Sequence, residues 1–590
     1  MTEKQTPFAK DAASGDRPMR PDVMASRHVV ASGHYLSAQA GFQILEAGGN
    51  AVDAGVTAGL ATCVLESEFV GFGGVAPTLI YLADRQEVVT ISGVGPWPRA
   101  ASCAYFQERH GGKVPDGLLH TVVPAAPDIW ITALERYGTI SFGEAAAAAI
   151  RLARDGFPMY PMMRERLADK REAFSRWPTT AAIFLPNGRL PEVGELFVQR
   201  DLGKTLQYLA DEEAAHAGRG RDAGFQAARD AFYRGDIAAA LVRHQESDGG
   251  LMTREDLADF KAEFEPPCRT RFHDAQVYST GPWCQGPMIL EALNFLERFD
   301  LASLGHNSAD YIHAVAEALK LAAADRECYY GDTKFIDVPL DILLSKPYAE
   351  ERSALIRPDR AWPEMPPPGV VGGRVPPPWM PDPSSGSAAV GEAAQPLETS
   401  YLCAVDAKGN VFSATPSDPV ISGPVTPGTG ITASMWGSRA HTNPDHPACV
   451  GPGRRPRMSA SPMLAIGDDG TVIPFGSPGS EVVGQAQMQA FLNVKVFGMS
   501  PQAAVEAPRF ASYSWPGSAL PHSYHPGRIN LEGRIDRTVG DALTGLGHDV
   551  RWWPDFKWLA GSVCTVRVDG KTGVRQAGAD PRRTAYAVGW

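Results

Sequence analysis

The sequence lacks the features that direct a protein to a membrane or to nucleic acid. Its longest nearly apolar run, residues 54–65, is shorter than the roughly 20 residues that cross a bilayer. The first 20 residues are polar and charged throughout, without the apolar core of a secretion signal. Lys and Arg number 55 against 67 Asp and Glu, so the net charge of −12 gives no general attraction to nucleic acid or to an anionic membrane. We expect a soluble, cytoplasmic protein that acts on a small molecule.

The sequence also lacks the motifs of conventional hydrolases and of metal sites. It contains no GxSxG, no HExxH and no complete phosphate-binding loop. Its 8 cysteines form no CxxC pair, so they predict neither a zinc site nor a disulfide framework. We expect no metal and no organic cofactor.

Two segments have compositions unsuited to a packed structure. Residues 1–26 are predicted to form a flexible arm. Residues 362–398 contain two Pro-Pro-Pro runs and several Gly and Ser residues. Because proline removes backbone donors and glycine raises the entropic cost of ordering, this second segment is predicted to be mobile. Because a mobile stretch of about 35 residues is unusual inside a compact unit, we expect this segment to have a function.

A β-hairpin is predicted directly after that segment. Residues 400–406 and 410–414 are predicted strands, and Ala407-Lys408-Gly409 between them suits a tight turn. A flexible segment that runs into a strand beginning at Thr399 is the layout expected if the chain is cut between Glu398 and Thr399. Once Thr399 is N-terminal, its α-amine, with a pKa of about 7.7–8.0, is able to act as general base for its own hydroxyl.

Motifs spread along the chain are specific in combination. They are ASGHYLSAQAGFQILEAGGNAVDA (31–54), GFGG (71–74), YIHAVAEALKLAAADRECYYGD (311–332), TSYLCAVDAKGN (399–410), PGTGI (427–431), RRPRMSASP (454–462), FGSPGS (475–480) and GADPRR (578–583). On these motifs the chain resembles the γ-glutamyltranspeptidase family of N-terminal nucleophile hydrolases over nearly its full length.

The resemblance implies an α/β fold with four layers, an αββα sandwich, made as one precursor that cuts itself. The large subunit would be residues 27–398 after the arm, with 362–398 as its mobile end, and the small subunit would be residues 399–590. The two subunits would stay together, and whether they form a homo-oligomer is left open.

The resemblance also assigns roles to single residues. Thr399 aligns with the family's catalytic threonine, and Ser417 with a second hydroxyl that hydrogen-bonds the nucleophile. Gly479 and Ser480 align with a Gly-Gly pair that forms the oxyanion hole; backbone N–H groups donate there, so the serine retains the donor. The implied reaction is acylation of Thr399 by an amide carbonyl, followed by release to water or to an amine.

The residues that read glutamate in the family are mostly replaced here. Val94 stands in the segment where the family keeps an arginine for the α-carboxylate, and Pro419 replaces an asparagine. The polar stretch that holds the glutamyl amine becomes residues 432–437, TASMWG. Of the family's serine pair, only Ser459 remains, next to Met458. Loss of the charged partner of a carboxylate in a buried site typically costs several kcal/mol. Such a loss is large enough to change the preferred substrate.

We therefore expect an amide substrate other than a γ-glutamyl compound. Aromatic contacts are predicted from Trp97, Trp283 or Trp436, and Ser459 would remain a substrate contact. A replacement anchor for a carboxylate is predicted among Arg99, Arg439 and Arg457.

Three alternatives stay open from the sequence. The first is true γ-glutamyl or glutathione hydrolysis or transfer despite the altered pocket. The second is hydrolysis of a small acid amide, as in the family's oxamate-cleaving branch. The third is an uncleaved homologue that binds rather than catalyses.

Overall fold

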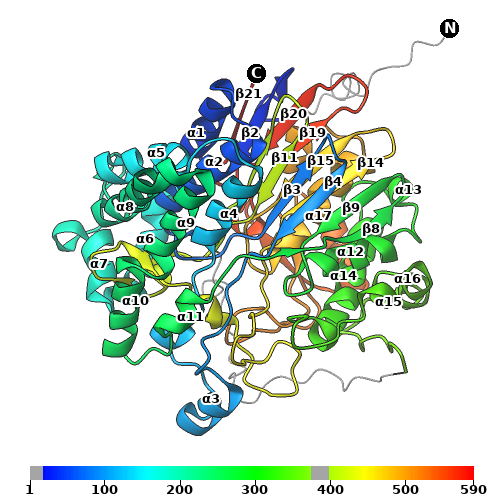
Figure 1. Cartoon of the computed structure of the whole chain (residues 1–590). Coiled ribbons are helices and arrows are strands. Elements are labelled where there is room, and N and C mark those ends of the chain that lie inside the picture. The colour runs from blue at the N-terminus through cyan, green and yellow to red at the C-terminus, as the bar shows by residue number, and fades with distance from the viewer. Residues whose placement is uncertain (1–17, 374–397) are drawn as a thin grey trace.

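The computed structural model describes residues 18–373 and 398–590. Most of the predicted arm (1–17) and most of the predicted mobile segment (374–397) lie outside the described residues. Two antiparallel sheets form the centre of the molecule (Figure 1). The first, sheet A, has the strand order β1 (Val23–Ala25), β20 (Arg575–Ala579), β19 (Cys564–Val568), β15 (Val472–Gly476), β14 (Met463–Gly467), β9 (Ala275–Ser279) and β8 (Cys268–Phe272). The second, sheet B, has the order β21 (Tyr586–Gly589), β2 (Val29–Ser32), β10 (Leu402–Val405), β11 (Val411–Ala414), β3 (Thr78–Leu82), β4 (Glu87–Ile91) and β7 (Phe264–Glu265).

Helices cover the outer face of each sheet, as Figure 1 shows. Sheet B is covered by α1 (Tyr35–Glu46), α2 (Ala51–Leu65), α4 (Ala126–Tyr137), α5 (Phe142–Asp155), α8 (Arg200–His216), α9 (Arg221–Tyr233) and α10 (Asp236–Ser247). Sheet A is covered by α12 (Gly286–Leu296), α14 (Ala309–Tyr329), α16 (Lys346–Ser353), α17 (Val482–Lys495) and α18 (Pro501–Glu506). The predicted αββα sandwich is confirmed. No helix among the described residues has the length and apolar content needed to cross a bilayer.

The alternation of side chains along each strand produces these layers. In β10, Leu402 and Ala404 pack against the helices over sheet B, whereas Cys403 and Val405 join the core between the sheets. Successive side chains of a strand point to opposite faces, so a strand buried on both sides reads as a continuous apolar run.

The predicted hairpin occupies the middle of sheet B. Its first strand, β10, pairs with β2, with Leu402 opposite Ser32, and its second strand, β11, pairs with β3, with Ala414 opposite Thr78. Both neighbours come from the segment N-terminal to Thr399. A cut before Thr399 would therefore leave the two pieces joined within one sheet.

Helix α2 brings a loop of the N-terminal half to this hairpin. Asn50 and Asp53 form a capping box at its start, and every residue of the helix is buried. A Cβ on Gly55 would lie 2.1 Å from the Phe412 ring of β11, so only glycine permits this approach. The chain that leaves α2 at Leu65 then runs along the start of β10.

The edges of the two predicted flexible segments are packed. Val23–Ala25 form β1, which pairs with β20. This end of the predicted flexible arm is therefore part of sheet A. Beyond α16, the Trp362 N–H donates to Glu317 at 2.9 Å, and the Gly369 N–H donates to Asp325 at 2.7 Å. In the described part, residues 362–373 are thus irregular but bound to buried carboxylates of α14.

The start of α1 is fixed by a side-chain cap. His34 is the N-cap, because its ring accepts the Leu36 N–H, and the helix starts at Tyr35. Ser37 is buried inside the first turn, where its hydroxyl donates to the His34 carbonyl.

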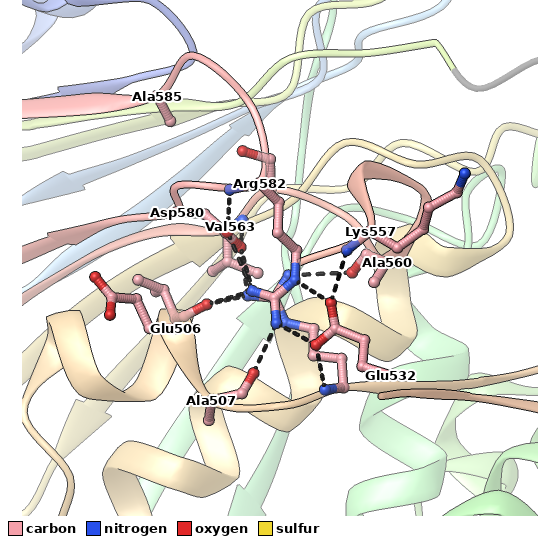
Figure 2. A network of polar contacts seen from close by, with 12 residues as sticks. Glu506, Ala507, Glu532, Lys557, Ala560, Val563, Asp580, Arg582 and Ala585 are labelled. Carbon is pink, nitrogen blue, oxygen red and sulfur yellow. Dashed lines mark hydrogen bonds and ion pairs between the residues drawn. The ribbon is translucent and has the colours of Figure 1, made fainter. Parts of the chain in front are cut away.

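A buried network of charges ties the C-terminal strands to the helices over sheet A (Figure 2). The Arg582 guanidinium donates to both oxygens of Glu532, at 2.8 and 2.5 Å, and to Asp580 at 3.1 Å. It also donates to the carbonyls of Val505 and Ala507 at the end of α18. Asp580 in addition accepts from Arg509. The next residue after Arg582, Arg583, points to Thr399, so this network fixes part of the region described below.

We predict that Arg582→Met lowers the free energy of unfolding by about 3–5 kcal/mol, because it leaves the carboxylates of Glu532 and Asp580 buried with fewer partners. Thermal and urea unfolding of the purified protein measure the effect. The matched control is Arg551→Met, which removes an exposed arginine paired with Asp549 and should change stability by less than about 1 kcal/mol. Equal stability losses in the two variants would contradict this account of the network.

Candidate active site

Thr399 lies just before β10 with all of its polar groups engaged. Its N–H donates to the Phe69 carbonyl at 3.1 Å, and its own carbonyl accepts from Arg583 at 3.1 Å. Its hydroxyl is 2.7 Å from the hydroxyl of Ser417. The side chains of Thr399 and Ser417 are buried. The predicted nucleophile and its predicted hydroxyl partner are therefore in direct contact.

Ser417 is held by the glycine loop that follows α2. Its N–H donates to the Val75 carbonyl at 3.0 Å, and the two residues form an isolated antiparallel bridge. A Cβ on Gly74 would lie 2.4 Å from the Ser417 carbonyl oxygen, closer than real contacts allow. The GFGG motif at 71–74 thus permits the close approach of two backbones that places Ser417 beside the nucleophile.

The carbonyl of Glu398, which is the carbonyl of the bond before Thr399, faces a backbone donor. The Gly479 N–H donates to it at 3.3 Å. Gly479 has a φ of +131° and Ser480 a φ of +52°, and these two residues precede α17. Such donors stabilise the negative charge that develops on a carbonyl oxygen under attack. Of the two predicted oxyanion residues, Gly479 therefore lies at the carbonyl that a Thr399 hydroxyl would attack.

The backbone is strained at this junction. Thr399 has a φ of +94°, a conformation that is rare for any residue with a side chain and more so for a β-branched one. Asp418, next to Ser417, has a φ of +88°. Strained backbone of this kind costs of order 1–3 kcal/mol per residue and persists where the surrounding structure enforces it. Cleavage before Thr399 would release the strain at that residue, because its nitrogen would no longer be part of a peptide bond.

Three buried carboxyl groups surround the nucleophile. Burial raises the pKa of Glu66 to about 7, although its hydrogen bond from the Ser400 hydroxyl at 2.7 Å and the charge of Arg583 oppose the shift. Burial likewise raises the pKa of Glu68 to about 8 and that of Asp418 to about 7. Burial also lowers the pKa of Arg583 to about 10. Burial therefore shifts all three carboxyl groups toward their protonated forms.

Of the three arginines predicted as carboxylate anchors, the structure brings one to the nucleophile. Arg439 donates to Glu398 at 2.7 Å and lies over the Trp436 ring at 3.6 Å. Arg457 is bound elsewhere, to Glu327 at 2.6 Å. Arg99 is exposed and pairs with Asp259 at the surface.

The three tryptophans predicted as aromatic contacts belong to one buried cluster. Trp97, Trp283 and Trp436 pack together with Val94, the residue that stands where the family keeps its arginine. The indole nitrogens of Trp97 and Trp436 have no hydrogen-bond partner among the described residues. The hydroxyl of Ser459 is also buried without a partner there, so it is available to a bound molecule. Of these residues, Trp436 is linked to Thr399, through Arg439 and Glu398.

Sequence reasoning missed several groups of the site. Arg583 was noted within the GADPRR motif but was given no role, and it binds the Thr399 carbonyl. Glu66 and Glu68 follow the buried helix α2, and two acids just after a mostly apolar segment were the available signal. The Phe69 carbonyl carried no signal, since a backbone acceptor is independent of side-chain type.

Two groups of side chains in the described chain have the geometry to hold a metal ion. One comprises His313, Glu317 and His548, and the other Glu327, His441 and His446. In each group the glutamate already pairs with a cationic side chain: Lys320 pairs with Glu317, and Arg457 pairs with Glu327. Neither group contains Thr399 or a residue that contacts it.

Comparison with known proteins places this geometry in a family. A model described as gamma-glutamyltranspeptidase matches residues 37–590. The chain belongs to the gamma-glutamyltranspeptidase family. It is therefore an amidohydrolase of the N-terminal nucleophile type, and the fold and the enzyme class expected from the motifs are confirmed.

The similar proteins are named as acylases and as glutathione hydrolases. The Acylase ACY 1 proenzyme of Pseudomonas sp. (strain SE83) is 32% identical over 540 residues, 89% of this chain and 87% of the relative. The Glutathione hydrolase-like YwrD proenzyme of Bacillus subtilis (strain 168) is 29% identical over 576 residues, 97% of this chain and 100% of the relative. The solved structure of cephalosporin acylase from Bacillus halodurans is 27% identical with a TM-score of 0.83 and covers 100% of this chain and 99% of its own.

The buried acids give a prediction about pH. Glu68 has an ordinary pKa of 4.5 when unfolded and about 8 when folded, so between these values the native state holds a proton that the unfolded state lacks. Its contribution to stability is therefore lost as the pH rises through this window. The free energy of unfolding should fall between pH 5 and pH 8 in both proteins. We expect the fall to be smaller in Glu68→Gln than in the wild type, by about 1 kcal/mol or more.

Urea unfolding at several pH values measures this difference. The matched control is Glu172→Gln on the exposed face of α6 (Pro161–Ser175), which should keep the wild-type dependence. A Glu68→Gln variant whose stability falls with pH as steeply as that of the wild type would show that Glu68 is ionised in the native state.

Proposed function

We propose that the chain cuts its own bond between Glu398 and Thr399 and then acts as a threonine acylase on an amide other than a classical γ-glutamyl compound. One arrangement carries the proposal. The Glu398 carbonyl is hydrogen-bonded by Gly479, while the Thr399 hydroxyl on the other side of the same bond is hydrogen-bonded to Ser417. The names of the relatives, which include proenzymes and acylases, support it.

Self-cleavage follows from attack of the Thr399 hydroxyl on the Glu398 carbonyl carbon. The C–O bond forms as the hydroxyl proton leaves, and collapse of the intermediate breaks the C–N bond, with a proton passing to the nitrogen. The product is an ester between Glu398 and the Thr399 hydroxyl, with a free α-amine. Water then hydrolyses the ester, which returns the proton to the hydroxyl and makes Glu398 the carboxyl terminus of the large subunit.

The same groups serve the reaction on a substrate. The free amine of Thr399 takes the proton of its own hydroxyl, which attacks the amide carbonyl of the substrate. The backbone N–H groups of Gly479 and Ser480 receive the developing oxyanion, and the proton passes to the leaving amine. Hydrolysis of the acyl-Thr399 ester completes the turnover. Ser417 positions the nucleophile throughout through its hydrogen bond.

The replacement at Val94 favours an acylase over a γ-glutamyl hydrolase. Val94 packs with Trp97 and Trp436 in an apolar cluster and supplies no cation of its own to hold an α-carboxylate. True γ-glutamyl hydrolysis, cleavage of small acid amides and a purely binding role are the competing outcomes of the test below.

We predict that the mature protein forms an acyl-enzyme on Thr399. Rapid quenching during turnover of a chromogenic amide, followed by mass spectrometry, should show the acyl mass on the 399–590 chain. Thr399→Ala should give neither the adduct nor any turnover. Ser417→Ala should fold and lose roughly 10–1000-fold in kcat, since it removes one hydrogen bond to the nucleophile and not the nucleophile itself.

The same assay, repeated with a panel of anilides, measures which acyl group the enzyme prefers. Turnover of simple acyl anilides in preference to γ-glutamyl anilide would support the acylase. Preference for γ-glutamyl anilide would favour the glutathione hydrolase alternative, and no turnover of any amide by a cleaved protein would overturn the proposal.

A further inference from the structure

We propose that Cys449 and Cys103 form a reversible disulfide bond when the protein meets a hydroperoxide, and that this bond joins the two subunits once the chain has cut itself. Cys103 lies in the part of the chain before Thr399, and Cys449 lies in the part after it. The joining of the subunits rests on the proposed function, because only cleavage at Thr399 puts the two cysteines in separate chains. The pairing of the two thiols does not depend on cleavage.

The fold brings together two cysteines that lie far apart in the sequence. Cys103 is the first residue of α3 (Cys103–His110) and is buried. Its thiol donates to the Val450 carbonyl at 3.2 Å, and the same sulfur lies 3.7 Å from the His441 carbonyl oxygen. Val450 follows Cys449 directly, and His441 pairs with Cys449 in an isolated parallel bridge. The Cys103 sulfur therefore lies against the backbone that carries Cys449.

The chain around Cys449 is held by its own hydrogen bonds. The Cys449 N–H donates to the His446 carbonyl at 3.0 Å, and the Val450 N–H donates to the His441 carbonyl at 2.8 Å. Val450 also packs in the same buried cluster as Cys103. Both sides of the contact are therefore ordered, and this order keeps the two sulfur atoms near each other.

A cation stands beside the Cys449 sulfur. The Arg454 guanidinium donates to that sulfur at 2.7 Å and to the Cys449 carbonyl at 3.3 Å. A hydrogen bond from the Cys103 thiol, together with the charge of Arg454, lowers the pKa of the Cys449 thiol to about 6, although burial opposes the shift. Because Cys449 is partly exposed, a small oxidant in the solvent reaches a thiolate there.

The other buried thiols are shifted in the opposite direction. Burial raises the pKa of Cys63, Cys268, Cys284, Cys403 and Cys564. The hydrogen bond with Cys449, together with burial, also raises the pKa of Cys103, so the pair holds one thiolate and one thiol. Oxidation of Cys449 removes its negative charge. Cys103 is then free to ionise at the start of α3, since the N-terminus of a helix favours a thiolate.

The oxidation balances with hydrogen peroxide as the oxidant. The Cys449 thiolate attacks one peroxide oxygen, the O–O bond breaks, and the leaving hydroxide takes up the proton that the Cys449 thiol gave to solvent. The Cys103 sulfur then attacks the sulfur of the Cys449 sulfenic acid, whose S–O bond breaks, and the Cys103 proton leaves with the hydroxyl as water. Two thiols are oxidised to one disulfide, one peroxide is reduced to two waters, and a dithiol such as dithiothreitol restores both thiols.

Gel electrophoresis of the mature wild-type protein tests the proposal. The protein is reduced, freed of reductant and treated with an equimolar amount of hydrogen peroxide. Without reductant in the sample, the two subunits should then run as one band with the mass of the whole chain, and with dithiothreitol they should run as two. Cys103→Ser and Cys449→Ser should give two bands in both samples. The matched control is Cys328→Ser, which removes a partly exposed cysteine of α14 and should behave as the wild type does.

Two outcomes of this experiment would overturn the inference. One is a wild type that still gives two bands without reductant, and the other is a joined band that persists in Cys103→Ser or Cys449→Ser. A protein that runs as one band even with dithiothreitol is uncut, which would overturn the proposed function and with it the joining of subunits. Mass spectrometry of a digest then decides the pairing: a linked peptide pair that contains Cys103 and Cys449 supports it, and the absence of that pair overturns it.

The rate at which Cys449 is alkylated tests the part played by Arg454. Arg454→Met should slow the reaction of the Cys449 peptide with iodoacetamide near pH 7 roughly 10-fold, because it removes the cation that favours the thiolate, and Arg454→Lys should restore most of the rate. The wild type gives a measurement that needs no variant, since a thiol with a pKa of about 6 should react at a rate that levels off above about pH 7. An unchanged rate in Arg454→Met, or a wild-type rate that keeps rising past about pH 8.5 as for an ordinary cysteine, would overturn the inference.

Discussion

The structure depends on how the peptide bond between Glu398 and Thr399 is held. Gly479 binds the carbonyl of that bond, Phe69 accepts the N–H, Ser417 contacts the hydroxyl and Arg583 binds the carbonyl that follows. These groups come from four separate parts of the chain. Because β10 is fixed between β2 and β11 in the middle of sheet B, the bond cannot relax away from them, and Thr399 keeps a positive φ. The fold in effect maintains a strained, polarised bond with a hydroxyl beside it.

The electrostatics of the buried site depend on three buried carboxyl groups and on the arginines beside them. Glu66, Glu68 and Asp418 lose water on folding, which favours their protonated forms, and Arg583 and Arg439 supply cations close to the bond. The chain places the first cation on the Thr399 carbonyl and the second on the side chain of Glu398.

Much of the fold could be predicted from the sequence because its signals are local. The hairpin after Thr399 follows from its two strand-like segments and the tight turn between them. The identities of Thr399, Ser417 and Gly479 followed from motifs. The sequence could not place Glu66 against Ser400, 334 residues away, or Arg583 against Thr399, 184 residues away, since such contacts arise only when sheets close. Nor could it choose among Arg99, Arg439 and Arg457, which differ in their partners and not in their type.

The central claim is that this geometry is a cleavage site. The direct test is intact mass of the purified wild-type protein together with N-terminal sequencing of its chains. The account predicts two chains that copurify, the smaller beginning at Thr399 and ending at Trp590. A single chain that stays whole on prolonged incubation, with the Thr399 nitrogen still in a peptide bond, would contradict it.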